Sequence, residues 1–296
     1  MLRWGIIAAV VSSFIGGTNI VATRAIAGAF DPEMLGVLRF GIAGLLMLPL
    51  ALRRPGPAVP RSELGRLLAL GLLCFTLQPL LYNVSLVHTT AARAALAMST
   101  MPLLTMLLSA ALGYERLTRR RTLGVLVAIG GVALALLAGL GTAPEGAWVG
   151  DLVMLACAGV MAIFNVFCPP AVARVGVIPF TCFTMLWGVV PLQLIAGATG
   201  DFPALAEASL AAWGGVAYLS LAGGIGSFLL WSYALKTAPP TVCAVTVSLN
   251  PVAAVFIGAL LLGESVGLLQ VLGLVAVCFG IWLSSTAQRA RLPPSR

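Results

Sequence analysis

The sequence predicts an all-α integral membrane protein whose ten transmembrane helices form two inverted five-helix repeats. Composition is the first observation behind this prediction: hydrophobic residues make up 60% of the 296 residues, and charged residues only 9%. About a quarter of the residues of a typical soluble domain are charged, and so few charges cannot cover the surface of a soluble chain of this length. The composition therefore excludes a disordered chain, a coiled coil and an ordinary cytosolic enzyme.

Ten apolar runs are the second observation, because a helix needs about 20 consecutive apolar residues to cross a bilayer. Nine of the runs contain no Asp, Glu, Lys or Arg, and the second is interrupted only by Arg39. In order, the runs are Trp4–Thr23, Met34–Leu52, Leu67–Ala92, Ala94–Tyr114, Thr122–Pro144, Leu152–Ala173, Val175–Gly200, Ala208–Leu235, Thr237–Gly263 and Ser265–Gln288. Backbone groups must be hydrogen-bonded within lipid, so continuous runs predict helices and exclude the alternating pattern of a barrel.

The first run resembles a signal peptide only in its position. It is longer than the apolar core of a signal peptide, and no clear small-residue cleavage site follows it. We therefore expect a helix that is retained. In the longest runs, Pro and Gly residues are expected to mark the loops.

The basic residues fall into alternate gaps between the runs, which predicts the orientation of the helices. One set of gaps contains only Arg24 and Arg93, together with seven acidic residues. The opposite set contains Arg3, Arg53, Arg54, Arg61, Arg66, Arg116, Arg119, Arg120, Arg121, Arg174, Lys236, Arg289, Arg291 and Arg296. Because positively charged loops stay in the cytoplasm, both termini are expected there. The net charge of +8 then reflects membrane topology and indicates no nucleic acid partner.

An internal repeat is the third observation. A shift of 149 residues aligns the fourth and fifth runs with the ninth and tenth. The aligned pairs include Ser99 with Ser248, Pro102 with Pro251, Glu115 with Glu264, Gly124 with Gly273 and Gly131 with Gly280, and at a nearby offset Asn19 with Asn165. The two repeats, residues 1–146 and 147–296, contain five runs each, an odd number, so the second must enter the membrane from the opposite side.

Inverted repeats are typical of secondary transporters, whose substrate site lies near the membrane midplane where the halves meet. The alternative is a duplicated membrane protein that transports nothing.

Short motifs mark the first half, and part of this pattern is repeated in the second half at the same spacing. They are Leu38-Arg39-Phe40, Pro102-Leu103, Glu115-Arg116-Leu117, Gly124 and Gly130-Gly131-Val132, followed by Asn250-Pro251, Glu264, Gly273 and Gly280. These residues match the pattern of the drug/metabolite transporter superfamily, and nearly the whole chain resembles its ten-helix EamA-type branch. Two departures from the family pattern are Ser265, where a basic residue commonly follows the Glu, and Met101, where the second half has Asn.

The resemblance implies a multi-pass transporter of the bacterial inner membrane that moves amino acids or similar small metabolites, often by efflux, without a cofactor. Its partners would be a small-molecule substrate and the lipid bilayer. The sequence leaves the oligomeric state open, a monomer included. Efflux of multiple drugs or lipophilic cations is the alternative within transport, and a membrane-embedded enzyme or a lipid flippase is the alternative outside it.

Pro102 and Pro251 lie within the fourth and ninth runs, where we expect them in the middle of a helix. Each would remove a backbone donor and free the carbonyl four residues earlier, with Ser99 and Ser248 as candidate donors to the freed groups. A pair that recurs by symmetry favours a hinge at the repeat interface. The alternative is a tolerated kink, since Pro is common in membrane helices.

Polar and aromatic side chains deep in the runs are the candidates for substrate binding. Amides in a membrane face protein or a water-filled cavity, but each could serve only a helix–helix hydrogen bond. The aromatic candidates could line a pocket or pack against lipid. The substrate-binding candidates are Asn19, Gln78, Tyr82, Ser99, Met101, Asn165, Trp187, Ser227, Trp231 and Asn250.

Two ionisable residues are further candidates. Arg39, inside a run, could hold a substrate carboxylate, or it could pair with Asp31 or Glu33 and serve only the fold. His88, the only histidine, could act as a gate, but a lone histidine forms neither a metal site nor a catalytic triad. We therefore predict no catalytic residue, no metal and no enzyme.

The remaining features narrow the mechanism. No Asp or Glu lies in the middle of a run, so the usual coupling carboxylate of a proton-driven transporter is missing. No Walker-type phosphate loop is present, so ATP is not expected to drive transport. The six cysteines lie in apolar runs without C-x-x-C spacing, which predicts buried thiols rather than a metal or redox site.

Overall fold

The computed structural model describes residues 2–26, 29–53, 59–137, 145–199, 208–262 and 267–286. Over these residues the chain is helical and contains no strand. Eight helices are long and apolar enough to cross a membrane, and a shorter apolar helix covers Pro240–Ala254. The prediction of an all-α integral membrane protein is therefore confirmed, whereas the ten-helix count and the inversion stay predictions.

Each apolar run of the sequence overlaps at least one of the described helices. Those of the first half are α1 (Leu2–Ala25), α2 (Pro32–Leu52), α3 (Arg61–Gly71), the π-helical segment η1 (Leu72–Leu77), α4 (Gln78–His88), α5 (Ala91–Met98), α6 (Met101–Ala111) and α7 (Arg119–Ala135). Those of the second half are α9 (Ala147–Val175), α10 (Val177–Thr199), α12 (Leu210–Tyr218), the π-helical segment η2 (Leu219–Gly226), α13 (Ser227–Thr237), α14 (Pro240–Thr246), α15 (Leu249–Leu262) and α16 (Leu268–Thr286).

Two irregularities occur at matching places in the two halves. The 149-residue offset places η1 on residues 221–226, which lie inside η2. The helices are also interrupted at residues 99–100, between α5 and α6, and at residues 247–248, between α14 and α15. Short π-helical segments are frequent at functional sites, and broken helices form the substrate sites of many transporters.

Pro102 and Pro251 lie near the start of new helices, so the prediction that they lie in the middle of a helix is wrong. Pro102 is the second residue of α6, and Pro251 is the third residue of α15. In the first turn of a helix the backbone N–H has no intrahelical partner, so proline costs no hydrogen bond there. Ser99 Oγ donates to the carbonyl of Leu96 at 2.6 Å, not to the carbonyl of Met98.

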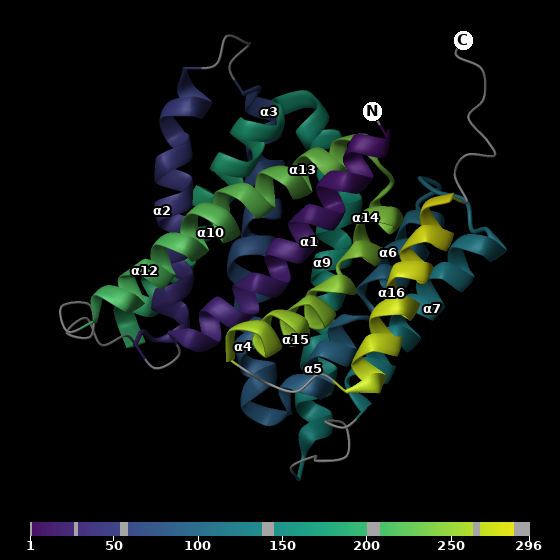
Figure 1. Cartoon of the computed structure of the whole chain (residues 1–296). Coiled ribbons are helices and arrows are strands. Elements are labelled where there is room, and N and C mark those ends of the chain that lie inside the picture. The colour runs from purple at the N-terminus through teal and green to yellow at the C-terminus, as the bar shows by residue number, and fades with distance from the viewer. Residues whose placement is uncertain are drawn as a thin grey trace, which may run out of the picture.

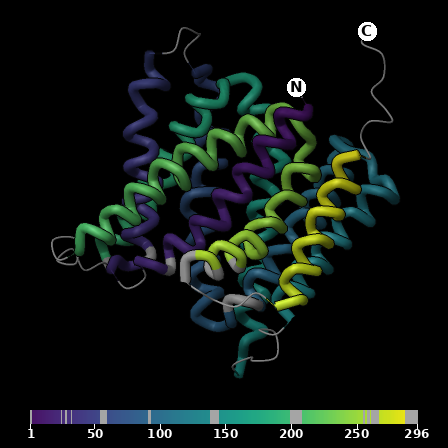
Figure 2. Tube along the Cα trace, viewed as in Figure 1, coloured from purple at the N-terminus to yellow at the C-terminus, as the bar shows by residue number. Residues whose placement is uncertain are grey.

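α7 and α16 lie side by side (Figure 2), and two glycine contacts bring their backbones close together. A Cβ atom at Gly124 would lie 2.7 Å from the carbonyl oxygen of Gly280, and one at Gly131 would lie 2.9 Å from the carbonyl oxygen of Gly273. Small residues let membrane helices approach this closely. The two helices are therefore antiparallel, and the 149-residue offset converts one glycine pair into the other.

Corresponding helices of the two halves have corresponding neighbours. α1 packs against α13 and α15, while α9 packs against α4 and α6. α2 and α10, which are equivalent in the repeat, pack against each other. The two halves therefore pack against each other through several pairs of helices.

Most of the described basic residues gather on one side of the bundle. In Figure 1 the starts of α1 and α3 and the end of α16 all lie at the top. On that side Arg174 donates to Glu63 at 2.5 Å, which joins the end of α9 to α3. At the opposite side Arg93 pairs with Asp151, which also accepts a hydrogen bond from Thr89 at 2.8 Å. This separation matches the alternation of charged gaps in the sequence.

Five of the six cysteines are buried, as predicted. Cys278 is exposed on α16, so the prediction is wrong for this thiol. An apolar run alone does not show which face of a membrane helix packs against protein, because the lipid-facing side is equally apolar.

Candidate functional site

Asn165 joins three helices through its side chain. The residue has no exposed surface. Trp231 Nε1 of α13 donates a hydrogen bond to Asn165 Oδ1 at 3.2 Å, and Asn165 Nδ2 donates to Met101 Sδ of α6 at 3.7 Å. Three of the predicted binding residues are therefore in contact, and they come from both halves of the chain.

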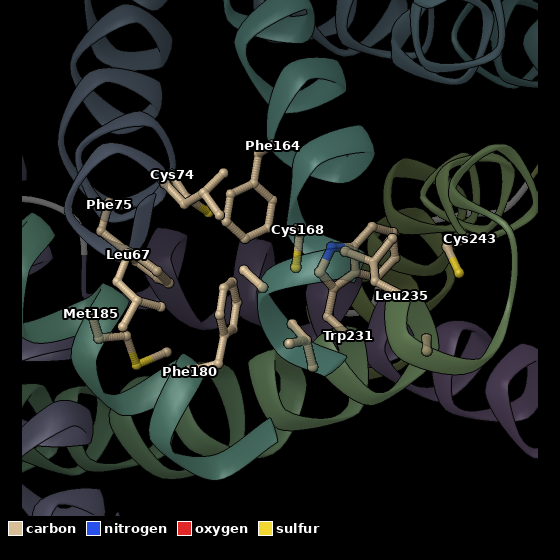
Figure 3. Close-up of a cluster of buried hydrophobic side chains, with 14 of the residues drawn as sticks. Leu67, Cys74, Phe75, Phe164, Cys168, Phe180, Met185, Trp231, Leu235 and Cys243 are labelled. Carbon is tan, nitrogen blue, oxygen red and sulfur yellow. The ribbon is translucent and has the colours of Figure 1, made fainter. Parts of the chain in front are cut away.

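Trp231 belongs to a large cluster of buried apolar residues. Figure 3 shows its ring close to Cys168 and Leu235, with the buried Phe164 and Phe180 farther along the cluster. Packing fixes the indole ring, so its N–H needs a polar partner within reach. Asn165 supplies that partner. A ligand that reached Asn165 would meet a polar group beside an apolar wall.

Polar side chains of α1 form a second group of contacts with the second half. Ser12 Oγ donates to the carbonyl of Ser227 at 2.8 Å, and the two hydroxyl oxygens lie 3.0 Å apart. The hydroxyl groups of Ser13 and Thr246 lie 2.9 Å apart. The hydroxyl of Ser227, a predicted binding residue, is therefore engaged in joining α1 to α13.

Asn19 and Arg39 meet at Gly223 in η2, and we call these three residues the Gly223 cluster. A Cβ atom at Gly223 would lie 2.6 Å from Asn19 Oδ1, so the amide lies directly against this glycine. Arg39 Nη2 donates to the carbonyl of Gly223 at 3.4 Å. Asn19 Oδ1 and Arg39 Nε are both buried without a hydrogen-bond partner among the described residues.

Asn250 contacts the same face of α1 one helical turn away. A Cβ atom at Gly16 would lie 2.7 Å from Asn250 Nδ2. Gly16 precedes Asn19 by three residues, and residues at this spacing share a face of a helix. Asn250 Oδ1 and the hydroxyl of Ser248 are also buried without a partner in the described part of the chain. The unpartnered amides therefore follow one face of α1.

The structure places other predicted residues outside these two groups. His88 is the last residue of α4 and is exposed, and Trp187 exposes 45% of its surface on α10. Tyr82 packs beside Cys157, whose thiol donates to the carbonyl of Gln78 at 3.5 Å. Among the described contacts, none connects these side chains with Asn165 or with the Gly223 cluster.

A cavity of about 800 Å³ opens on the basic side of the bundle. It lies between the α6–α7 loop, α9, the start of α14 and the end of α16. The lining residues are Tyr114, Glu115, Arg116, Leu117, Thr118, Arg120, Arg121, Val166, Pro169, Pro170, Pro239, Pro240 and Thr286. Val166 directly follows Asn165 in α9, so the cavity extends to the turn of the helix that carries the buried amide.

Glu115 connects the two halves at this cavity. Its carboxylate accepts hydrogen bonds from Arg121 Nη1 and, at 3.2 Å, from the backbone N–H of Thr241. The side chains of Arg121 and Glu115 expose only 7% and 8% of their surface. Arg121 belongs to α7 and Thr241 to α14, so one carboxylate holds both halves together beside the cavity.

The cavity was not predicted from the sequence, in which Glu115 stands out only as part of a repeated motif. Two Pro-Pro pairs, at residues 169–170 and 239–240, line it. Each pair lies near the basic end of an apolar run, so both pairs are expected at a similar depth in the membrane. This common position could have indicated the cavity from the sequence. Glu264, the counterpart of Glu115 in the repeat, lies outside the described residues.

A comparison with models of protein families identifies the family of this chain. The model of the EamA-like transporter family matches the chain twice, over residues 3–137 and 148–286. The chain belongs to the EamA-like transporter family. The resemblance to the drug/metabolite transporters drawn from the sequence is thereby confirmed, and this EamA-like chain is a membrane transporter.

Relatives of this EamA-like transporter are also named as transporters. An uncharacterized transporter of Bacillus subtilis, YyaM, is 25% identical over 280 residues, which cover 93% of this chain and 90% of the relative. A probable terminal-alkyne amino-acid exporter of Streptantibioticus cattleyicolor is 29% identical over 250 residues, covering 80% of this chain and 82% of the exporter. The uncharacterized inner membrane transporter YedA of Escherichia coli is 26% identical, covering 91% and 86%.

A solved crystal structure matches the EamA-like fold over almost its full length. The TM-score is 0.84, and the match covers 98% of this chain and 99% of the solved chain. The two sequences are 20% identical, so the likeness concerns the fold alone.

Proposed function

We propose that this EamA-like transporter is a secondary transporter of the bacterial inner membrane that exports amino acids or similar small metabolites by alternating access. The cavity of about 800 Å³ between the halves carries the proposal. It is open on one side of the bundle, and one of its lining residues, Val166, directly follows Asn165, whose hydrogen bond with Trp231 joins α9 to α13. A volume of this size fits a small-molecule substrate.

Alternating access in this proposal depends on ten helices arranged as two inverted halves. The crossed contacts of Gly124 with Gly280 and of Gly131 with Gly273 support the inversion. So do the matching π-helical segments, the matching helix breaks and the double match to one family model. Rocking of one half against the other around a fixed site is the usual motion of such transporters.

The direction of transport follows from the proposed orientation. Basic loops stay in the cytoplasm, so the basic side of the bundle, both termini and the cavity would face the cytoplasm. The cavity would then receive substrate from inside the cell. Export is also the activity named for the relative from Streptantibioticus cattleyicolor.

The charges of the cavity disfavour the alternative of lipophilic cation efflux. Arg116, Arg120 and Arg121 line the cavity beside a single carboxylate, that of Glu115. A cationic drug would be repelled by this surface, whereas a substrate that carries a carboxylate would be attracted. The enzyme and flippase alternatives receive no support from the relatives, which are named as transporters.

Counterflow in proteoliposomes tests the proposed function. Purified protein would be reconstituted and loaded with unlabelled L-leucine, L-phenylalanine or L-propargylglycine, and entry of the same labelled compound would be followed. We expect counterflow of at least one amino acid, independent of an imposed pH gradient because the apolar runs contain no acidic residue in their middle. His88→Ala should leave it unchanged. Absence of counterflow for a broad amino-acid panel would refute the proposed substrate class, and uphill uptake that is lost in His88→Ala would refute the proposed coupling.

A further inference from the structure

Arg39 carries a charge inside a predicted span without an acidic partner among the described residues. The ion pairs of the described part of the chain join Arg66 and Arg174 to Glu63, Arg93 to Asp151 and Arg121 to Glu115. The contacts of Arg39 are a 3.4 Å hydrogen bond to the Gly223 carbonyl and a 4.9 Å approach to the ring of its neighbour Phe40. An unpaired charge within a membrane span is costly and marks a functional position.

The packing of α2 against η2 does not require an arginine at position 39. In the repeat, α10 corresponds to α2 and η1 corresponds to η2, and these two elements also pack against each other. There Thr76 Oγ1 donates to the carbonyl of Gly188 at 2.5 Å, and α10 contains no charged residue between Val177 and Thr199. A neutral side chain is therefore sufficient to pack this pair of elements, and the charge of Arg39 needs another explanation.

Arg39 Nε and one amide oxygen of the Gly223 cluster both lack a hydrogen-bond partner among the described residues, and a second such amide oxygen lies farther along α1. Asn19 Oδ1 is buried against Gly223, and Asn250 Oδ1 is buried one turn along α1. Buried polar atoms without a partner are rare in folded proteins, and each costs free energy while it stays unpaired. A ligand that supplies an anionic group to the guanidinium and a cationic N–H group to the amide oxygens would satisfy all three residues together.

We propose that Arg39, Asn19 and Asn250 bind the charged end of a zwitterionic α-amino acid. The guanidinium of Arg39 binds the carboxylate, and the amide oxygens of Asn19 and Asn250 accept hydrogen bonds from the ammonium group. This inference rests on the proposed function and gives it a substrate class. A site built this way rejects an analogue that lacks either charge, because the protein group opposite the missing charge stays buried and unpaired.

Competition in the counterflow assay tests the inference. The labelled probe is L-leucine, L-phenylalanine or L-propargylglycine, and the competitors are the same amino acid, its methyl ester and its N-acetyl derivative. We expect the wild type to prefer the free amino acid at least tenfold over either derivative, because each lost charge-assisted hydrogen bond weakens binding by about tenfold or more. Arg39→Gln should lose the preference over the ester, whereas Arg39→Lys should retain part of it.

Two glycines of η2 provide a second test that keeps the arginine. In Gly223→Ala the new Cβ atom would collide with the amide of Asn19, so the half-saturating concentration of the amino acid should rise several-fold. Gly226→Ala is the matched control, because its Cβ atom would meet only the carbonyl oxygen of Leu221, at an ordinary 3.5 Å. This pair of variants decides the matter if Arg39→Gln does not fold.

The outcomes separate the inference from the proposed function. Counterflow in the wild type without discrimination against the ester, or with the same discrimination in Arg39→Gln, would overturn the inference and leave amino-acid transport intact. Equal half-saturation in Gly223→Ala and Gly226→Ala would also overturn it. A wild type that transports none of the amino acids would refute the proposed function itself.

Discussion

Gly124 of α7 and Gly280 of α16 face each other through their backbones. A Cβ atom on Gly124 would lie 2.7 Å from the carbonyl oxygen of Gly280, and one on Gly280 would lie 2.6 Å from the carbonyl oxygen of Gly124. The obstacle is backbone in both directions, so neither helix can accommodate a side chain by a change of rotamer. This contact holds the last described helix of each half at a separation that only glycine permits.

Gly124→Ala should therefore destabilise the protein. Forcing an extra carbon into a packed contact costs about 1–3 kcal/mol, which exceeds the gain of up to about 1 kcal/mol from replacing a helical glycine by alanine. The matched control is Gly130→Ala in the same helix, where a Cβ atom would meet nothing within 4 Å. Thermal melting in detergent should show a lower midpoint for Gly124→Ala alone. A midpoint equal to that of the control would contradict the proposed tightness of this contact.

The hydrogen bond between Trp231 and Asn165 should support transport. Asn165→Ala and Trp231→Phe each remove one partner, and each should weaken the apparent affinity several-fold, since a hydrogen bond contributes about 1 kcal/mol. Asn250→Ala should weaken transport as well. The double variant of Asn165 and Trp231 should be less impaired than the sum of the two single variants, because both remove one interaction.

Gln193→Ala is the control for these amide variants, since Gln193 is exposed on α10. If Asn165 only joined helices, its replacement would lower the melting temperature and leave the apparent affinity unchanged. Unchanged transport in both asparagine variants at equal protein level would place the binding site elsewhere in the chain.

The ion pair between Glu115 and Arg121 should stabilise the contact between the halves. Glu115→Gln retains an acceptor for the Thr241 N–H but leaves Arg121 buried and unpaired, and breaking one side of a buried pair costs about 3–5 kcal/mol. Adding Arg121→Gln to this variant removes the uncompensated charge and should restore part of the stability. Arg116→Gln is the control, because Arg116 lines the same cavity but is exposed. A double variant that melts no higher than Glu115→Gln would show that the charge pairing is unimportant.

Pro102→Ala and Pro251→Ala should slow turnover more than they change affinity. An alanine restores a backbone N–H, which lets the helix continue through the interruption that precedes each proline. Initial rates at saturating substrate should fall, while the half-saturating concentration should stay within about twofold. Pro49→Ala, in the exposed part of α2, serves as the control. Unaltered rates in both variants would argue against a role of these interruptions in the transport cycle.

Residues on the basic side should be accessible only from the cytoplasm. Single cysteines at Arg61 and Arg119, introduced into a variant without the six native cysteines, should react with an impermeant maleimide only after cells are opened. A cysteine at Glu145, on the opposite side, should react in intact cells. Labelling of the cysteine at Arg61 or Arg119 from outside would overturn both the orientation and the inversion.

The sequence by itself determined the membrane class, the charge bias of the two sides and the repeat. These properties depend on composition and spacing along the chain, because lipid selects apolar runs of fixed length and loop charges set the orientation. The sequence predicted Asn165, Trp231 and Met101 only as separate candidates for substrate binding and did not predict that they are in contact. Their contact arises from the packing of α9 against α13 and α6, whose residues are about 65 positions apart in the sequence.

Only the tertiary structure decided which polar groups are satisfied and which are not. Ser227 and Asn19 read alike in the sequence, as single polar residues in apolar runs, yet the hydroxyl of Ser227 is bonded to Ser12 while the amide oxygen of Asn19 has no partner in the described chain. The tertiary structure likewise placed Pro102 in the first turn of a helix and revealed the cavity beside Glu115. The reason is physical: hydrogen-bond satisfaction and cavities depend on which helix faces which, and in a membrane protein both the buried and the lipid-facing sides of a helix are apolar.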